Sequence, residues 1–109
     1  MIYDTSNIFA RIIKKEVPCN LVFEDETLIA FHDINPRAKV HVLVIPKLEV
    51  VAFEDFVRDF DSNVVANFFK KVEYIAKNVL KLEHFRLQTN NGLASGQEAF
   101  HFHIHILSN

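Results

Sequence analysis

The chain has 109 residues, half of them hydrophobic, and a formal net charge of -2 from 12 basic and 14 acidic residues. This length and composition fit a single core, so we expect residues 1–109 to form one domain. The basic residues are scattered, which argues against the clustered basic surface of a protein that follows a nucleic-acid backbone.

The first residues lack the basic start and apolar run of a secretory signal, and no apolar stretch reaches the roughly 18 residues of a membrane span. We therefore expect a cytoplasmic protein that does not contact membranes. Cys19 is the only cysteine, so we expect no internal disulfide and no Cys-x-x-Cys zinc site.

The first predicted elements are a short helix and a β-hairpin. Apolar residues recur at helical spacing over residues 8–13, behind a cap at Ser6 or Asn7. Residues 21–24 and 28–34 then predict two antiparallel strands around an acidic turn.

The middle of the chain predicts a buried strand followed by helices. His41 leads into the nearly continuous apolar run 42–45, which is typical of a strand buried on both faces, and Pro46 ends it. Residues 54–60 indicate a short helix. Ser62 then offers a cap for a long helix whose apolar residues recur at i, i+3 and i+4.

The last part of the chain predicts two strands, residues 85–89 and 100–107, joined by a polar loop. Together these elements predict an α+β domain with a largely antiparallel five-stranded sheet, one long helix and one short helix.

Both glycines of the chain, Gly92 and Gly96, lie in the polar loop just before three histidines. Glycine permits positive φ and close approach of the backbone to a ligand, and turns with inward-pointing amides form anion sites. The loop therefore suits a phosphate, although it could also be an ordinary hairpin loop.

Three histidines alternate with apolar residues in the final predicted strand. Side chains alternate between the faces of a strand, so His101, His103 and His105 share one face. The opposite face is apolar and comprises Phe100, Phe102, Ile104 and Ile106. The histidine face has three interpretations: a solvated surface, a metal site, or nucleophilic and acid/base catalysis at phosphorus.

The run of residues 101–107 resembles the His-φ-His-φ-His-φ-φ signature of the histidine-triad (HIT) superfamily, where φ is hydrophobic. Four further segments resemble the Hint branch of this superfamily in order and spacing. They are residues 7–18, residues 31–36, residues 41–47, and the loop with Asn90, Gly92, Gly96 and Gln97. The resemblance covers nearly the whole chain except residues 48–85, which match only as helix.

The resemblance implies a role for each histidine of the signature. His103 matches the nucleophile that attacks the α-phosphate of a nucleotide and forms a nucleotidyl-histidine intermediate. His105 matches the residue that contacts the phosphate and assists the leaving group, while His101 and His41 match members of the supporting hydrogen-bond array.

The resemblance also implies a nucleotide pocket. Asp33 matches the carboxylate that binds the ribose hydroxyls. Alternation along its strand independently places Phe31 on the same face, where its ring could contact the base. The residues matched to the base pocket are Ile8, Phe9, Ile12, Phe31 and Ile34, and those matched to the phosphate side are Asn90, Gly96, Gln97 and Glu98.

Two positions depart from the Hint pattern. At Glu98 much of the branch has a serine donor, whereas an ionised carboxylate cannot donate a hydrogen bond and would repel an anion. The sequence ends at Asn109, where Hint proteins usually continue into a tail that shapes the active site of the dimer partner. We therefore expect leaving-group selectivity to differ from that of the branch.

The resemblance implies a homodimer, its sheet continuing from one subunit to the next, that hydrolyses the phosphorus–nitrogen bond of purine nucleoside 5′-phosphoramidates. This reaction requires no metal or other cofactor. Two alternatives stay open: hydrolysis of dinucleoside polyphosphates, and a nucleotide-responsive binding module whose turnover is incidental.

Overall fold

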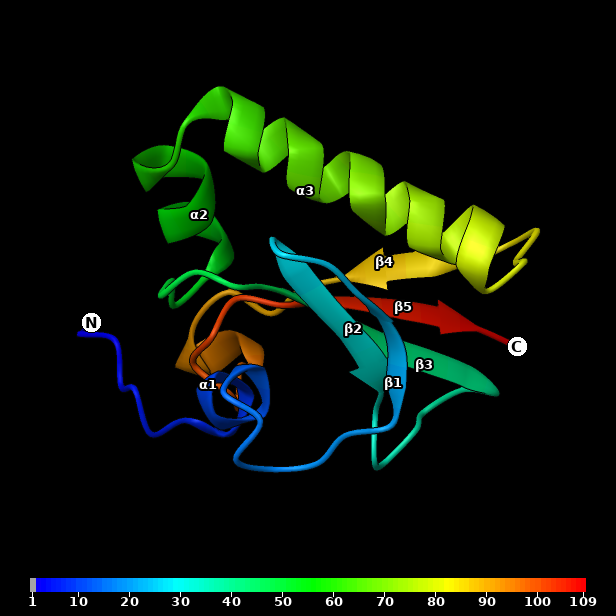
Figure 1. The fold of residues 1–109 in the computed structure, drawn as a ribbon, viewed down its shortest axis with the longest axis horizontal. Coiled ribbons are helices and arrows are strands. Elements are labelled where there is room, and N and C mark those ends of the chain that lie inside the picture. Colours follow the sequence, from blue (N-terminus) through cyan, green and yellow to red (C-terminus); the bar gives the residue numbers. More distant parts are fainter. Residues whose placement is uncertain (1) are drawn as a thin grey trace.

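A five-stranded antiparallel sheet forms the centre of the fold (Figure 1). The computed structural model describes residues 2–109. The strands are β1 (Leu21–Glu24), β2 (Leu28–His32), β3 (Val40–Pro46), β4 (Arg86–Gln88) and β5 (Ile104–Ser108). Their order across the sheet is β1-β2-β3-β5-β4, and every neighbouring pair is antiparallel. The predicted α+β class, the sheet and the β1–β2 hairpin are therefore confirmed.

Helices cover both faces of the sheet. They are α1 (Ile8–Ile13), α2 (Phe53–Asp59) and α3 (Ser62–Tyr74), and α3 continues as a π-helical turn over Ile75–Val79. In Figure 1, α2 and α3 lie on one side of the sheet and α1 lies on the other. No helix within residues 2–109 is both long enough and apolar enough to cross a membrane.

Of the two predicted helix N-caps, the structure confirms one and contradicts the other. Asn7 caps α1, since its side-chain oxygen accepts a hydrogen bond from the backbone N–H of Ala10, as predicted. The prediction of Ser62 as the cap of the long helix is wrong. Asp61 holds that position and accepts from the backbone N–H of Asn63, so Ser62 is the first residue inside the helix.

Two apolar clusters pack against the sheet. The larger lies beneath α2 and α3 and includes Phe56, Phe68, Phe102, Ile104 and Ile106. The smaller lies beneath α1 and comprises Phe9, Ile12, Ile29, Phe31, Leu43 and Ile45. Alternate residues of β3 contribute to both clusters, which confirms that this central strand is buried on both faces.

The histidine strand is shorter than predicted, because β5 begins at Ile104 rather than at residue 100. The register pairs Val44 with Ile104, so continued pairing would bring Phe102 opposite Pro46. Proline has no backbone N–H to offer a ladder. The carbonyl of Pro46 accepts a hydrogen bond from the ring of His101 instead, and pairing stops.

Candidate active site

The histidines gather on the sheet face that carries α1. Phe102, Ile104 and Ile106 point into the cluster under α2 and α3, as alternation predicted. The prediction for Phe100 is wrong: it precedes the strand and lines a cavity together with His103 and His105.

The hydrogen bonds of His103 fix its protonation. Its Nδ1 lies 2.7 Å from the backbone carbonyl oxygen of His101, and a carbonyl can only accept. Nδ1 therefore carries the proton and Nε2 has a free lone pair. Within residues 2–109, Nε2 of His103 has no hydrogen-bond partner. Every buried side-chain nitrogen or oxygen in these residues does have one, so Nε2 is not among the buried atoms. Nε2 is therefore not sealed in the protein, and a ligand can reach it.

A second chain of hydrogen bonds determines which ring nitrogen carries the proton in His105 and in His41. The backbone N–H of Arg37 donates to Nδ1 of His41 at 3.1 Å, so the ring proton of neutral His41 is on Nε2. That N–H lies 2.9 Å from Nδ1 of His105 and 3.3 Å from a carboxylate oxygen of Asp33. His105 then accepts at Nδ1 and keeps its own proton on Nε2, where it can serve as a donor.

The local register brings these two rings together. His41 lies opposite Leu107 and His105 lies opposite Leu43, so the two histidines are diagonal neighbours on one face of the β3–β5 pair. The backbone N–H of Asp33 donates to the carbonyl of His41 at 2.8 Å, which holds the carboxylate beside the rings just after β2 ends. The predicted strand over residues 28–34 thus ends two residues early.

Burial keeps these histidines neutral. It lowers the pKa of His101 to about 4, and together with the nearby His103 ring it lowers the pKa of His105 to about 4. Burial also lowers the pKa of His103 and of His41, although the carbonyl of His101 and the carboxylate of Asp33 respectively oppose the shift. A neutral imidazole is the form that can act as a nucleophile.

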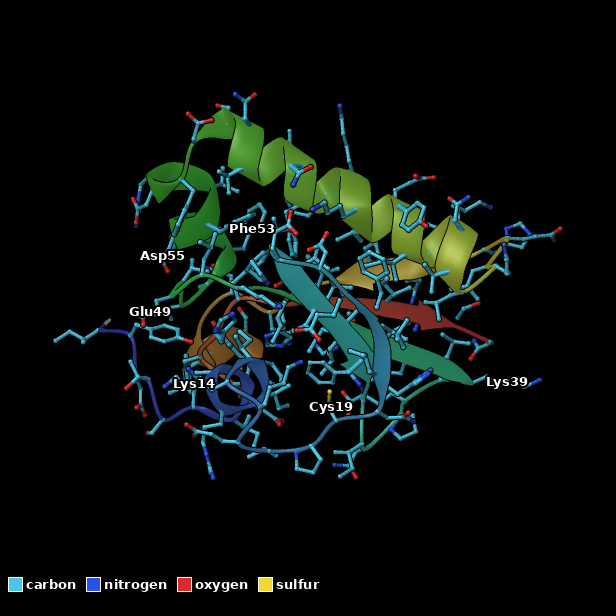
Figure 2. The ribbon with its side chains drawn as sticks, viewed as in Figure 1. Lys14, Cys19, Lys39, Glu49, Phe53 and Asp55 are labelled. Carbon is cyan, nitrogen blue, oxygen red and sulfur yellow. The ribbon has the colours of Figure 1, made fainter. Side chains whose placement is uncertain are left out.

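A cavity of about 1420 Å³ opens beside His103 and His105. We call this the main cavity. Nearly all the residues predicted to bind nucleotide line it: Ile8, Phe9, Ile12, Phe31, Asp33, Ile34, Asn90, Gly96 and Glu98. Apolar side chains beneath α1 form one wall, and half-buried Cys19 contributes to it on the same side of the sheet (Figure 2). His101 and His41 are buried behind this lining.

Gln97 occupies a different position from its predicted neighbours. It is 2% exposed and is not part of the cavity lining. Its side-chain oxygen accepts from the N–H of Gly92 at 2.8 Å, and its amide nitrogen donates to the carbonyls of Val51 and Ala99. Gln97 therefore supports the loop from inside.

The loop also depends on Gly96. Its φ of +90° is disfavoured for other residues, and an added Cβ would lie 2.9 Å from the side-chain nitrogen of Asn90. That nitrogen donates to the carbonyl of Ser95, and this hydrogen bond links the two sides of the loop.

Asp33, His41 and His105 place one donor atom each within 4.8 Å of one another, as metal ligands do. The hydrogen bond from Arg37 commits Nε2 of His41 to carry a proton, however. A metal ion would need the lone pair on that nitrogen. The hydrogen-bond pattern therefore favours a proton-linked array over a metal centre.

Two residues at the site carry no signal in the sequence pattern. The hydroxyl of Tyr3 lies 2.5 Å from Nδ1 of His101, although residues 2–6 have no periodicity that points to a site. Arg37 lies in the turn after β2. In addition to its backbone bond to His41, its guanidinium lies 3.5 Å from Nδ1 of His105 and lines the main cavity.

Known proteins resemble this chain over nearly its whole length. Residues 14–109 match the profile of the HIT domain. An uncharacterized HIT-like protein of Rickettsia prowazekii is 42% identical over 106 residues, which cover 96% of this chain and 88% of the relative. An uncharacterized HIT-like protein of Helicobacter pylori is 40% identical over 102 residues, covering 94% of this chain and 95% of the relative.

Solved structures agree with the sequence matches. A histidine triad protein from Clostridium difficile superposes with a TM-score of 0.86 at 33% identity, covering 99% of this chain and 94% of the other. A HIT family hydrolase from Clostridium thermocellum gives a TM-score of 0.85 at 37% identity, covering 95% and 90%. With His103 and His105 lining one cavity, His101 buried behind them, a matching domain profile and relatives that match over nearly the whole chain, the chain belongs to the HIT-domain family of the histidine-triad superfamily.

Proposed function

We propose that the protein is a nucleotide-binding hydrolase that cleaves the phosphorus–nitrogen bond of purine nucleoside 5′-phosphoramidates. The observation that carries this proposal is the unprotonated, accessible Nε2 of His103, whose other nitrogen is committed to a backbone carbonyl. Relatives described as HIT family hydrolases support the reaction class.

In this proposal, His103 attacks the α-phosphorus. A bond forms between Nε2 and phosphorus, the phosphorus–nitrogen bond of the substrate breaks, and its electron pair leaves with the amine. His105 faces the same cavity and donates its Nε2–H toward the phosphate and the departing nitrogen. The amine takes one proton as it leaves.

Water completes the proposed cycle by attacking the phosphorus of the nucleotidyl-histidine. The nucleoside monophosphate is released, His103 is regenerated, and the proton that the attacking water loses replaces the one that left with the amine. The net reaction consumes only water. The hydrogen bond from Nδ1 of His103 to the His101 carbonyl stabilises the positive charge that the ring carries in the intermediate.

The remaining cavity residues fit the nucleoside. The rings of Phe9 and Phe31 pack edge to face with their centroids 5.7 Å apart, and they form an apolar wall for the base. Asp33 lines the same cavity and can accept from the ribose hydroxyls. Asn90 and Gly96 line the same cavity, and in this proposal they meet the phosphate.

Arg37 favours a second candidate, the hydrolysis of dinucleoside polyphosphates. Its guanidinium is exposed, lines the main cavity and lies next to His105. A cation in that position would stabilise the extra phosphates of such a substrate. The two activities share the same nucleophile and differ in their leaving group.

We also propose that the protein acts as a homodimer. The edge strand β4 presents Leu87, which is 49% exposed, beside one unpaired edge of the sheet. Pairing or covering of such an edge is favourable for a sheet protein. Light scattering after gel filtration would report twice the monomer mass if the proposal is correct.

The first test replaces His103 with alanine. We expect turnover of an adenosine 5′-phosphoramidate to fall at least about 1000-fold, because the nucleophile is lost, while the Kd for the nucleoside monophosphate changes less than about tenfold. The control is His84→Ala, an exposed histidine outside the main cavity, which should retain wild-type turnover. Wild-type-like turnover by the His103 variant would reject the mechanism.

The same assay separates the two candidate functions. Wild-type protein is given an adenosine phosphoramidate and a diadenosine polyphosphate under identical conditions, and kcat/KM is compared. A higher value for the phosphoramidate supports the proposed function. A higher value for the polyphosphate supports the second candidate.

A further inference from the structure

The segment just before β5 has little regular backbone pairing. Within residues 2–109, Phe102 N–H donates to the carbonyl of Val50 at 2.8 Å, and the β3–β5 ladder begins only at Ile104. Yet this segment holds the His101 carbonyl that accepts the Nδ1–H of His103. The group that orients the nucleophile therefore needs support from outside the sheet.

The ring of His101 supplies that support because both of its nitrogens are bonded. Nε2 donates to the carbonyl of Pro46 at 2.8 Å, and Nδ1 accepts from the hydroxyl of Tyr3 at 2.5 Å. The ring is 1% exposed, and the Tyr3 ring meets it edge to face with centroids 5.6 Å apart. His101 is thus clamped between β3 and the N-terminal segment.

Tyr3 contributes chiefly through its hydroxyl. It belongs to neither apolar cluster under the helices. It lines a small cavity of about 170 Å³ together with His101, Lys14 and Glu49, and Figure 2 shows the latter two near the start of the chain. Burial raises the pKa of Tyr3, so its hydroxyl keeps the proton it donates.

We propose that Tyr3 is a positioning residue for the nucleophile: its hydroxyl fixes the His101 ring, and with it the carbonyl that keeps the proton of His103 on Nδ1. This inference extends the proposed function from the cavity to a residue that touches no substrate. Without the hydroxyl, Nδ1 of His101 loses its donor, the carbonyl moves, and His103 spends part of its time with Nε2 protonated.

The test compares Tyr3→Phe with Tyr74→Phe. Tyr74 is the chain's other tyrosine and lies 47% exposed on α3, where its ring packs against Phe23. We expect Tyr3→Phe to lower kcat about 3- to 10-fold with KM within about twofold of wild type, the size expected for one hydrogen bond. Tyr74→Phe should match wild type in both constants.

A spectroscopic measurement tests the geometry without turnover. Nitrogen-15 NMR of the imidazoles should show wild-type His101 protonated at Nε2 only, with a hydrogen-bonded Nδ1, and His103 protonated at Nδ1 only. In Tyr3→Phe the hydrogen-bond signature at Nδ1 of His101 should disappear and the Nε2-protonated form of His103 should increase.

The outcomes separate the two proposals. Unchanged kcat and unchanged His103 spectra in Tyr3→Phe would overturn the positioning role, as would wild-type His101 protonated at Nδ1. An equal loss of kcat in Tyr74→Phe would also overturn it. If no phosphoramidate is turned over at all, the proposed function fails, while the spectra of wild type and Tyr3→Phe still decide whether Tyr3 controls the tautomer of His103.

Discussion

Backbone groups set the protonation of the histidines at this site. The carbonyls of Pro46 and His101 bind the rings of His101 and His103, and the N–H of Arg37 binds His41. Backbone amides do not titrate near neutral pH, so these tautomers do not depend on the ionisation of a neighbour. The Nε2 of His103 is therefore unprotonated before any ligand binds, as the proposed mechanism requires.

Glu98 is an acidic residue in the cavity lining, and its negative charge would repel an anionic nucleotide. It is exposed and lines the main cavity together with Gly96 and His103, so its carboxylate adds negative potential where a phosphate would bind. We expect Glu98→Gln to lower the Kd for a nucleoside monophosphate about 2- to 5-fold at low ionic strength, and we expect this gain in affinity to disappear at about 1 M salt.

Isothermal titration at both salt concentrations would measure this effect. The control is Glu83→Gln, which removes the same charge at an exposed position outside the main cavity. If Glu83→Gln tightened binding equally, the effect would reflect net charge alone. An unchanged Kd for Glu98→Gln at low salt would contradict a role at the cavity.

Residue-level prediction from the sequence succeeded where side-chain direction follows from alternation. Phe31 and Asp33 line one cavity as predicted, and Ile104 and Ile106 are buried on the opposite side of the sheet from the histidines. Alternation gave no direction for Gln97, which turns inward to bind backbone groups. A loop has no periodicity from which the direction of a side chain could be inferred.

At the scale of elements, the limits of strands depend on partners that are remote in the sequence. The apolar alternation of residues 100–107 predicts a strand throughout, but pairing begins only at Ile104 because Pro46 lies opposite the preceding residues. That register was not visible in the local pattern. The existence of the strands and their largely antiparallel arrangement were predictable, whereas this boundary was not.

The cap of α3 gives a direct test of an element boundary. Asp61 accepts from the N–H of Asn63, whereas within residues 2–109 the Ser62 hydroxyl makes no hydrogen bond. We expect Asp61→Ala to lower the free energy of unfolding by about 1 kcal/mol, because a helix N–H loses its partner. Ser62→Ala should change it by less than about 0.5 kcal/mol.

Urea unfolding followed by circular dichroism would measure both variants. The difference between them decides which residue caps the helix. A larger loss for Ser62→Ala than for Asp61→Ala would support the cap predicted from the sequence and contradict the one in the structure.

At the scale of the whole molecule, the two faces of the sheet differ: one packs the larger core and the other borders the main cavity. The cluster under α2 and α3 forms the larger core, while the face under α1 shares its apolar residues with the main cavity. Segments remote in the sequence meet at the main cavity: α1, the end of β2, the loop that contains Gly92 and Gly96, and β5. The resemblance implied that these segments share one nucleotide pocket, whereas the hydrogen bonds that set the histidine tautomers could be read only from the fold.

The site histidines also make the stability of the whole molecule depend on pH. His101 and His105 have a pKa of about 4 in the folded state, chiefly because of burial. An exposed histidine in the unfolded chain has a pKa of about 6.5. Between these values the unfolded state binds more protons, so the free energy of unfolding rises with pH and falls as the solution is acidified.

We therefore expect a loss of stability as pH falls from about 6.5 toward about 4, with a slope approaching about 1.4 kcal/mol per pH unit from a fully buried histidine such as His101. Above that window these rings contribute no slope. Glu24, whose pKa is lowered by hydrogen bonds from Lys15 and Lys47, adds a loss at still lower pH because its protonation breaks these bonds.

Urea unfolding at several pH values would measure this dependence, with His101→Gln as the informative variant. Glutamine keeps hydrogen-bonding capacity but does not titrate, so this variant should be less stable than wild type near neutral pH and should show a shallower slope between about pH 6.5 and pH 4. His84→Ala, which removes an exposed histidine, should keep the wild-type slope. Equal slopes for wild type and His101→Gln would show that the buried ring is not the group that couples folding to protons.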